Sequence, residues 1–431
     1  MLTLIQDELK ESGIPAEQFV SINFETRTVD YVKSVDETYA FIKSVCEKNT
    51  AKTYLFLDEV QELNGWETLV NSCMIDFDCD IYVTGSNAKL LSGELATYLA
   101  GRYVKFNIYP FSFKEVTQMM PDKSEKEAFQ TYIQWGGMPF LYQFPMGERE
   151  KKQYLSDIYD SIMIKDIVAR NKIRDIEQFK RLLMYLVGSI GNTFSATSII
   201  RYLKRESRTI SNETLYNYLE YCRSACLISL VPRQNLIGNN MLQFQEKVYL
   251  TDHGIREAIY GNNFRDIGMV LENIVYMELL RRGYDVTIGK NKQLEIDFVA
   301  ENSGKRAYYQ VAYLLTDENT AEREFGAFRD IPDNYSKYVL TLDEFDFSRD
   351  GYQFSTRLLY NSRTFCSCYK TFLPSSLPTR FRIGRYRDIF LRHCSCSEQI
   401  RRVSVLLCTF RLYTGCLCPN AELHPSIRDR T

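Results

Sequence analysis

The stretches TYLFLDEV (53–60) and CDIYVTGSN (79–87) decide the fold of this 431-residue chain. Each is an almost unbroken apolar run that ends in polar residues, and the segment between them, NGWETLVNSCMIDF (64–77), has helical spacing. Strands that are apolar on both faces are typical of parallel sheets, in which a helix connects one strand to the next. The sequence therefore predicts a parallel α/β sheet here.

The flanking segments continue this α/β pattern in both directions. Further expected elements are helices at 2–12, 35–48 and 89–102 and strands at 19–25 and 103–110. From 112 to about 190 the pattern is helical. The length of the chain predicts two or three domains, because one ordinary core does not grow to this size.

The composition is that of a globular protein, with 45% hydrophobic and 25% charged residues. No apolar run reaches the roughly 18 residues that a transmembrane helix needs. The first residues include Asp7 and Glu8, whereas a signal peptide begins with basic and then apolar residues. We expect a cytoplasmic protein with reduced cysteines and no membrane partner.

The net charge of −2 is unevenly distributed along the chain. From residue 361 onward eleven Arg, one Lys and four acidic residues give a net +8, which leaves about −10 for the preceding residues. The net negative charge of residues 1–360 argues against nonspecific nucleic-acid binding by overall charge.

Seven of the twelve Cys lie in the segment 351–431, which we call the tail. Its three C-x-C pairs do not have the C-x₂₋₄-C spacing of structural zinc sites. We interpret the tail as aberrant, either because of a frameshift near Gly351 or as a disordered basic segment, with a zinc site as the third alternative.

Polar residues follow both of the strands quoted above. Asp58 and Glu59 stand at the carboxyl end of the first, where an Asp can organise Mg²⁺ and a Glu can polarise a water. The second strand ends in Thr84-Gly85-Ser86-Asn87, where a polar side chain can sense a γ-phosphate. Arg102 suits an arginine finger that acts on a neighbouring subunit. The alternatives are an exposed acidic turn and a surface salt bridge of Arg102.

Three strings carry a family resemblance, namely FLDEVQEL, VTGSNAKLLSGELATYLAGRYVKFNIYPFSFKE and QWGGMPFL (134–141). From residue 1 to about 350 the chain resembles prokaryotic AAA-type ATPases that carry a C-terminal domain of unknown function. The resemblance implies ATP and Mg²⁺ as cofactors and a homo-oligomer as a possible assembly. It implies that Asp58 binds the metal, Glu59 activates water, Asn87 or Ser86 is the sensor and Arg102 the finger.

The chain departs from this family at the phosphate-binding loop. The pattern G-x-x-x-x-G-K-[ST] does not occur, and Met1 stands where the helix after that loop would begin. The strand before the loop would lie in the middle of the sheet, so we expect a gap with unpaired backbone groups there. The explanations are a truncated gene product or a degenerate ATPase whose partner supplies the strand. In either case we expect no ATP hydrolysis by this chain alone.

Residues 178–260 resemble a winged-helix module. Helices at 195–205 and 211–227 precede strands at 227–234 and 246–252. The basic residues Arg201, Lys204, Arg205 and Arg208 can contact DNA phosphates, whereas the Tyr- and Leu-rich second helix suits protein packing. The client is therefore DNA or protein.

Residues 261–350 resemble the PD-(D/E)xK nuclease fold. Glu272 on a helix, Asp297 in the triplet Glu295-Ile296-Asp297 and Gln310 on the next strand have that spacing. Gln310 replaces a carboxylate and Ala312 replaces the lysine, so this resemblance does not imply catalysis. In the alternative interpretation Glu272 and Asp297 are ordinary acids near Glu278, Arg281 and Arg282.

The predicted fold class is α/β, with an incomplete parallel-sheet AAA core, a winged-helix-like middle and a nuclease-like α/β domain. The predicted segments are an AAA core at 1–125, a helical lid or connector at 126–177, and the segments 178–260, 261–350 and 351–431 described above. The leading functional interpretation is an AAA-type ATPase that, as this chain, neither binds nor hydrolyses ATP because its phosphate-binding loop is missing. The alternative is a non-catalytic DNA- or protein-binding module built from the two domains downstream.

Overall fold

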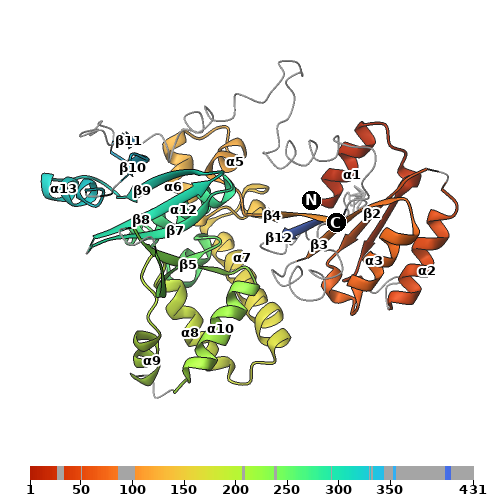
Figure 1. The fold of residues 1–431 in the computed structure, drawn as a ribbon, viewed down its shortest axis with the longest axis horizontal. Coiled ribbons are helices and arrows are strands. Elements are labelled where there is room, and N and C mark those ends of the chain that lie inside the picture. Colours follow the sequence, from red (N-terminus) through yellow and green to blue (C-terminus); the bar gives the residue numbers. More distant parts are fainter. Residues whose placement is uncertain are drawn as a thin grey trace, which may run out of the picture.

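A computed structural model describes most of the chain. The described residues are 1–26, 34–49, 51–85, 102–205, 209–236, 240–292, 294–329, 331, 333–343, 353–355 and 403–408. In Figure 1 the N-terminal sheet and its helices form the right-hand part of the molecule. The helical segment and a second, larger sheet form the left-hand part. Within the described residues, no helix is both long enough and apolar enough to cross a membrane.

The N-terminal sheet, sheet A, is entirely parallel with the strand order β1-β2-β3-β12-β4. Its strands are β1 (Phe19–Asn23), β2 (Thr53–Asp58), β3 (Cys79–Gly85), β4 (Tyr103–Ile108) and β12 (Val403–Cys408). Its helices are α1 (Leu2–Glu11), α2 (Val35–Cys46) and α3 (Trp66–Asp76), and the short 3₁₀ turns are η1 (Ala16–Gln18) and η3 (Val60–Glu62).

Alternate residues of β2 pack on opposite faces of sheet A. Leu55 and Leu57 belong to the core cluster that contains residues of α2 and α3. Phe56 faces the side of α1, where its ring stacks on Tyr82 with centroids 5.0 Å apart. All three β2 residues are fully buried, which explains why this strand is apolar throughout.

The expected gap lies between β3 and β4, and β12 fills it. Val403–Leu407 pair with Ile81–Gly85, and Val403–Cys408 pair with Tyr103–Ile108. The expectation of unpaired edges on β3 and β4 is therefore wrong, because a segment of the tail supplies the missing pairing. Of the tail, the structure describes only this strand and residues 353–355, so all three C-x-C pairs lie outside the described residues.

The segment after sheet A is helical, as predicted. It contains α5 (Phe113–Gln118), α6 (Glu125–Trp135), η5 (Pro139–Tyr142), α7 (Glu148–Ser161), a π-helical turn η6 (Ile162–Ala169) and α8 (Ile176–Gly188). Capping boxes start α5 at Ser112 with Glu115 and α6 at Ser124 with Glu127. The predicted helix at 89–102 lies outside the described residues except for Arg102.

The next elements match the sequence expectation for 195–252. They are α9 (Ala196–Arg205), α10 (Asn212–Ser224), and the antiparallel pair β5 (Ile228–Asn235) and β6 (Asn240–Leu250). The helices α11 (Gly254–Tyr260) and α12 (Ile267–Arg281) follow.

The second sheet, sheet B, is mixed and has the order β11-β10-β9-β8-β7-β5-β6. Its further strands are β7 (Asp285–Asn291), β8 (Leu294–Asn302), β9 (Lys305–Val311), β10 (Ser336–Leu340) and β11 (Gln353–Ser355), and α13 is Glu318–Gly326. Because β5 pairs in parallel with β7, the strands of the segment 178–260 continue directly into those of 261–350.

Candidate functional site

Asp58 lies at the carboxyl end of β2 and is held by both neighbouring strands. Thr84 of β3 donates a short hydrogen bond from Oγ1 to Asp58 Oδ1. Asn23 of β1, the register partner of Asp58, donates from Nδ2 to Oδ2 at 3.0 Å. Three parallel strands thus bring their polar ends together, and the carboxylate has one fixed orientation. We call these residues with Glu59 the Asp58 corner.

Glu59 follows immediately and has an unusual backbone conformation. Its φ is 52°, in the left-handed region that costs free energy for a residue with a side chain. Its backbone N–H donates to Thr84 Oγ1 at 3.2 Å, and Gln61 donates to its carboxylate. Glu59 is 8% exposed, so a nearly buried carboxylate residue follows Asp58 directly at the end of β2.

The chemistry of the Asp58 corner fits a magnesium ion. Carboxylate and hydroxyl oxygens are the hard ligands that Mg²⁺ prefers, and the ion usually keeps several waters. Gln61, whose amide nitrogen donates to Glu59, has a buried Oε1 without a hydrogen-bond partner among the described residues, and such an oxygen is a further hard ligand type. Sequence reasoning missed Asn23, although its place at the end of FVSIN was the available signal.

Of the other predicted nucleotide residues, the structure describes Arg102, which is not brought to this corner. Ser86 and Asn87 lie outside the described residues. Arg102 is exposed and directly precedes Tyr103, the first residue of β4. Through the strand register, Tyr103 is level with Ile81 of β3 and with Leu55 of β2. Asp58 is three residues further along, roughly 10 Å in the strand direction. Arg102 therefore lies toward the amino ends of the strands of sheet A, whereas Asp58 of the same chain lies at their carboxyl ends.

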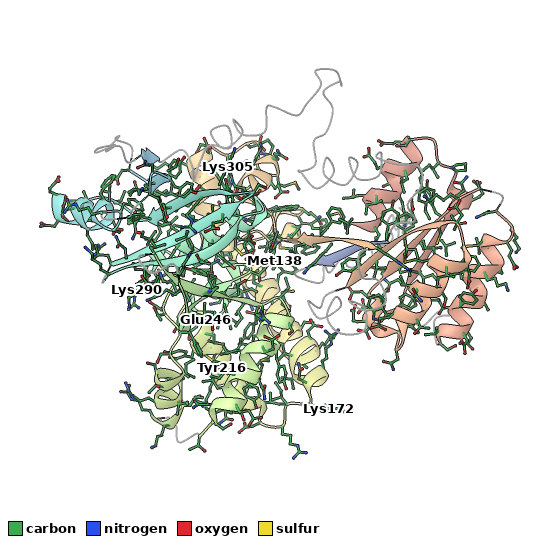
Figure 2. All side chains as sticks on the ribbon, in the orientation of Figure 1. Met138, Lys172, Tyr216, Glu246, Lys290 and Lys305 are labelled. Carbon is green, nitrogen blue, oxygen red and sulfur yellow. The ribbon has the colours of Figure 1, made fainter. Side chains whose placement is uncertain are left out.

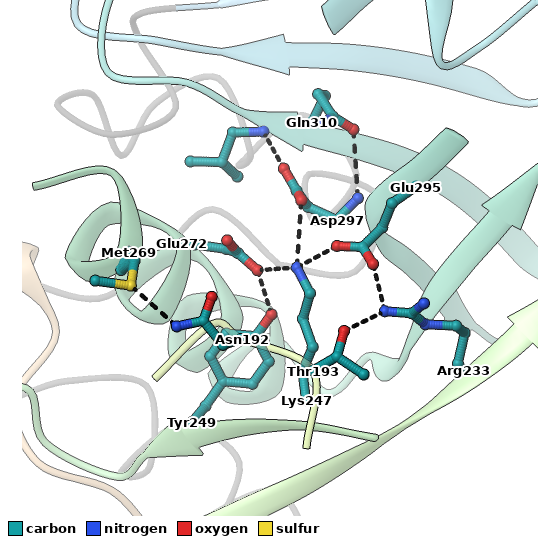
Figure 3. A network of polar contacts seen from close by, with 11 residues as sticks. Asn192, Thr193, Arg233, Lys247, Tyr249, Met269, Glu272, Glu295, Asp297 and Gln310 are labelled. Atoms are coloured by element: carbon teal, nitrogen blue, oxygen red, sulfur yellow. Dashed lines mark hydrogen bonds and ion pairs between the residues drawn. The ribbon is translucent and has the colours of Figure 1, made fainter. Parts of the chain in front are cut away.

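A second group of charged residues surrounds Lys247 of β6 (Figure 3). Lys247 Nζ lies 2.7 Å from Glu272 Oε1, 2.5 Å from Glu295 Oε1 and 3.6 Å from Asp297 Oδ1. The Tyr249 hydroxyl also donates to Glu272 Oε1, at 2.5 Å. We call Lys247 and these three acids the Lys247 cluster; it joins β6, α12 and β8.

The remaining predicted residue, Gln310, is part of the same surroundings. Its Oε1 accepts from the backbone N–H of Asp297 at 3.3 Å, and Asp297 Oδ2 accepts from Val311 N at 2.8 Å. Arg233 pairs with Glu295 and donates to Thr193 Oγ1 at 2.8 Å. The structure thus brings Glu272, Asp297 and Gln310 together, as their spacing predicts, but around an ammonium group.

Burial dominates the electrostatics of the Lys247 cluster. It raises the pKa of Glu272, with Lys247 opposing the rise, and together with Glu272 it raises the pKa of Asp297 well above its ordinary value. Burial opposes the charge of Lys247, but Glu272, Asp297 and Glu295 raise its pKa above the ordinary value. Lys247 is therefore the resident cation of the cluster.

Lys247 is the residue of this cluster that sequence reasoning missed. It lies on β6, far along the chain from the position of the lysine that Ala312 replaces. Within the described part of the chain, no group of three or more His, Cys, Asp or Glu side chains is arranged to hold a metal ion. The ion pairs described for Glu272 and Asp297 go to Lys247, while Glu278 pairs with Arg282 at 2.6 Å.

The motif QWGG (134–137) meets the segment 252–254 in a buried junction. Asp252 Oδ2 accepts from Gly137 N at 2.7 Å, and Oδ1 accepts from Gly254 N at 2.8 Å. His253 Nε2 lies 2.6 Å from the carbonyl oxygen of Tyr132. Met138, which follows the two glycines and is labelled in Figure 2, is 3% exposed and belongs to the core cluster that contains residues of α6, α7 and α11.

Burial shifts both ionisable groups of this junction toward their neutral forms. It raises the pKa of Asp252 to about 6, against the two backbone N–H groups that lower it. It lowers the pKa of His253 to about 4. The junction therefore connects α6 to α11 through two side chains that titrate in overlapping pH ranges.

The predicted basic helix α9 presents its charges to solvent. Arg201, Lys204 and Arg205 are exposed, whereas Arg208 lies outside the described residues. Beside α10 a cavity of about 780 Å³ is bordered by Phe194, Tyr216 and Glu246 among others (Figure 2).

Comparison with known proteins identifies the two parts of the chain. Residues 1–117 match the family described as "AAA domain", and residues 126–266 match "Domain of unknown function (DUF8612)". An uncharacterized protein of Haemophilus influenzae is 35% identical over 345 residues, which are 79% of this chain and 85% of that protein. An uncharacterized protein of Methanocaldococcus jannaschii is 32% identical over 355 residues, 77% of this chain and 78% of that protein. The chain belongs to the family of these two proteins, with an AAA domain at its N-terminus and the domain of unknown function after it.

Proposed function

We propose that the chain is an AAA-type ATPase-like protein whose Asp58 corner organises the magnesium ion of a bound nucleotide. The supporting observation is the convergence of Asn23, Asp58 and Thr84 at the carboxyl edge of a parallel sheet. Ligands of open α/β sheets bind at this edge. Magnesium would supply charge neutralisation of the phosphates, while Glu59, with its fixed backbone, polarises a water beside it.

The remaining roles rest on the resemblance of the sequence. We propose Ser86 or Asn87 as the sensor and Arg102 as a finger toward a neighbouring subunit. The position of Arg102 away from Asp58 of its own chain suits action on a second copy, and hence a homo-oligomer. The 431 residues contain no G-x-x-x-x-G-K-[ST] loop, so we propose that this chain alone does not turn over ATP and that the nucleotide binding it retains depends on the Asp58 corner.

A nucleotide titration tests the role of Asp58. A fluorescent ATP analogue is titrated with and without Mg²⁺ into the wild type, Asp58→Asn and Asp80→Asn. Asp80 is the matched control, because it lies toward the other end of sheet A and pairs with Lys52. We expect Mg²⁺ to strengthen binding in the wild type and in Asp80→Asn, and the loss of Asp58 to weaken that effect about tenfold. Equal Mg²⁺ dependence in Asp58→Asn and the wild type would refute the proposal.

The exposed basic residues of α9 favour a second candidate function, contact with nucleic-acid phosphates by the module 178–345. The test is a DNA-binding titration over a range of salt concentrations. The double variant Arg201→Ala/Lys204→Ala is expected to reduce the salt dependence of the affinity by about two phosphate contacts. The control, Lys114→Ala/Lys152→Ala, removes two exposed charges outside α9 and leaves the slope unchanged. Identical slopes in both variants exclude α9 as the contact.

A further inference from the structure

Strands β3 and β4 of sheet A depend on a segment from far downstream in the sequence. β1 to β4 lie within residues 19–108, yet β3 and β4 are joined through β12, at residues 403–408 (Figure 1). β12 is parallel to both neighbours and pairs with β3 over five residues and with β4 over six. The N-terminal segment therefore leaves a space one strand wide in the middle of its own sheet.

Such a space cannot stay empty without cost. Cys79, Ile81 and Val83 of β3 are fully buried with β12 in place, and without β12 the N–H and C=O groups that β3 directs toward it would lose their partners. A strand in the middle of a parallel sheet satisfies the backbone groups of both neighbours at once. The space between β3 and β4 therefore binds a strand of matching direction and length.

The sequence of β12 suits this position. Residues 403–408 read VSVLLC, an uncharged run rich in β-branched and aliphatic residues, within a tail that is otherwise rich in Arg and Ser. Near-continuous apolar runs of this kind are typical of central parallel strands. When a strand is added to a sheet, its main-chain hydrogen bonds provide the affinity. Specificity comes from the fit of alternate side chains against the neighbouring elements.

We propose that the space between β3 and β4 is a strand-binding site, and that its ligand is the segment 403–408 of the same chain. The segment docks onto β3 and β4 and completes the AAA domain. The chemical class of the ligand is an apolar peptide of about six residues in extended conformation, bound parallel to both edges.

Occupation of the site affects the Asp58 corner. Leu406 of β12 is the register partner of Thr84, and Thr84 bonds both Asp58 and the backbone of Glu59. Without β12, β3 becomes an edge strand at the level of Thr84, and the contact that orients Asp58 loses its support on one side. This consequence rests on the function proposed for the corner, whereas the strand-binding site itself does not.

Cross-linking tests the site in the full-length chain. Cys408 is the register partner of Ile108, so Ile108→Cys places two thiols on adjacent strands. A bifunctional thiol reagent matched to the strand spacing of roughly 5 Å links them, and mass spectrometry of the digest identifies the joined peptides. The control is Ile22→Cys on β1, from which β2 and β3 separate β12 by roughly 14 Å in total. Equal mixtures of ¹⁵N-labelled and unlabelled protein distinguish links within a chain from links between chains.

We expect a 108–408 link within single chains and no 22–408 link. A mixed-label 108–408 link would overturn the proposal, because the strand would then come from a second copy. Absence of the 108–408 link, or equal linking in both variants, would also overturn it.

A second measurement does not need cysteines. Leu406→Pro removes a backbone donor in the middle of β12, and Ser376→Pro is the control elsewhere in the tail. Hydrogen exchange of the amides of 81–85 and 103–108 is expected to rise about tenfold or more in Leu406→Pro alone. Unchanged exchange would refute the docking of this segment. Neither experiment uses nucleotide, so the strand-binding site can be confirmed even if the Mg²⁺ titration of Asp58 refutes the proposed function. Equally, the strand-binding site can be refuted while the titration supports that function.

Discussion

Lys247 of β6 lies 2.7 Å from the carboxylate of Glu272 on α12, with Glu295 and Asp297 of β8 on its other sides. The contact connects β6 with α12 and β8. The sequence predicts β6 as part of a winged-helix-like module, and α12 and β8 as parts of a nuclease-like domain. Sheet B is continuous through the same region, because β5 pairs with β7. The ammonium group and the shared sheet therefore make one folded unit of the two modules.

Removing the ammonium should destabilise this unit strongly. Lys247 is 4% exposed, so Lys247→Met leaves buried carboxylates without their cation and should lower the free energy of unfolding by about 3–5 kcal/mol. The measurement is chemical denaturation beside Lys114→Met, an exposed lysine whose loss should cost under about 0.5 kcal/mol. Adding Glu272→Gln to Lys247→Met should recover part of the loss, since it removes one uncompensated charge. Equal losses for Lys247→Met and Lys114→Met would contradict this role.

The neighbours Asp252 and His253 should give the unfolding free energy opposite pH slopes. Asp252 has a pKa of about 6 in the fold against an ordinary 3.8, so its contribution is complete below pH 3.8 and declines as the pH rises to 6. His253 has a pKa of about 4 against 6.5, so its contribution is complete above pH 6.5 and is lost as the pH falls to 4. Between pH 4 and 6 the two slopes, each up to about 1.4 kcal/mol per pH unit, should cancel.

Single substitutions separate these two slopes. Relative to the wild type, the stability of Asp252→Asn should rise with pH between 4 and 6, and that of His253→Gln should fall over the same range. Urea titrations at several pH values measure both, and taking the difference from the wild type removes the contributions of other groups. Two variants that follow the pH profile of the wild type would show that neither group is shifted in the fold.

Gly136 is required at the junction because of the space around it as well as its backbone angle. Its φ is +76°, and a Cβ would lie 1.9 Å from Asp252 Oδ1. Gly304 has almost the same φ, +78°, with nothing within 4 Å of a Cβ. Gly304→Ala should therefore cost about 1 kcal/mol from conformation alone, whereas Gly136→Ala should cost at least about 3 kcal/mol. Similar losses of stability in the two variants would show that the contact with Asp252 does not matter.

The regular elements could be predicted where local pattern and packing agree. The apolar run 53–58 is β2, the run 79–85 is β3, and the helix expected to carry Glu272 is α12 at Ile267–Arg281. In each case both faces of the element are covered, so the sequence pattern reflects burial directly. Asp58 and Glu59 were predictable for the same reason, since they mark the point at which an apolar strand ends.

Features that depend on distant pairing could not be predicted in this way. VSVLLC (403–408) is too short and isolated to indicate that it lies between β3 and β4. Lys247 follows a glutamate in an ordinary-looking strand, and only the fold brings it to Glu272 and Asp297. The pairing of β5 with β7 likewise crosses a boundary that the change of pattern near residue 260 suggested. Such contacts are set by tertiary structure, and the local periodicity of the sequence carries no information about them.

The most direct test of the proposed function is steady-state ATP hydrolysis by the purified 431-residue chain, measured beside Glu59→Gln. Glu59 is the residue proposed to polarise water at the Asp58 corner, and an amide in its place keeps the shape of the side chain without its basicity. The Asp58 corner is present while the sequence has no phosphate-binding loop motif. We expect the same background rate for the wild type and Glu59→Gln. Mg²⁺-dependent turnover by the wild type that Glu59→Gln abolishes would contradict it.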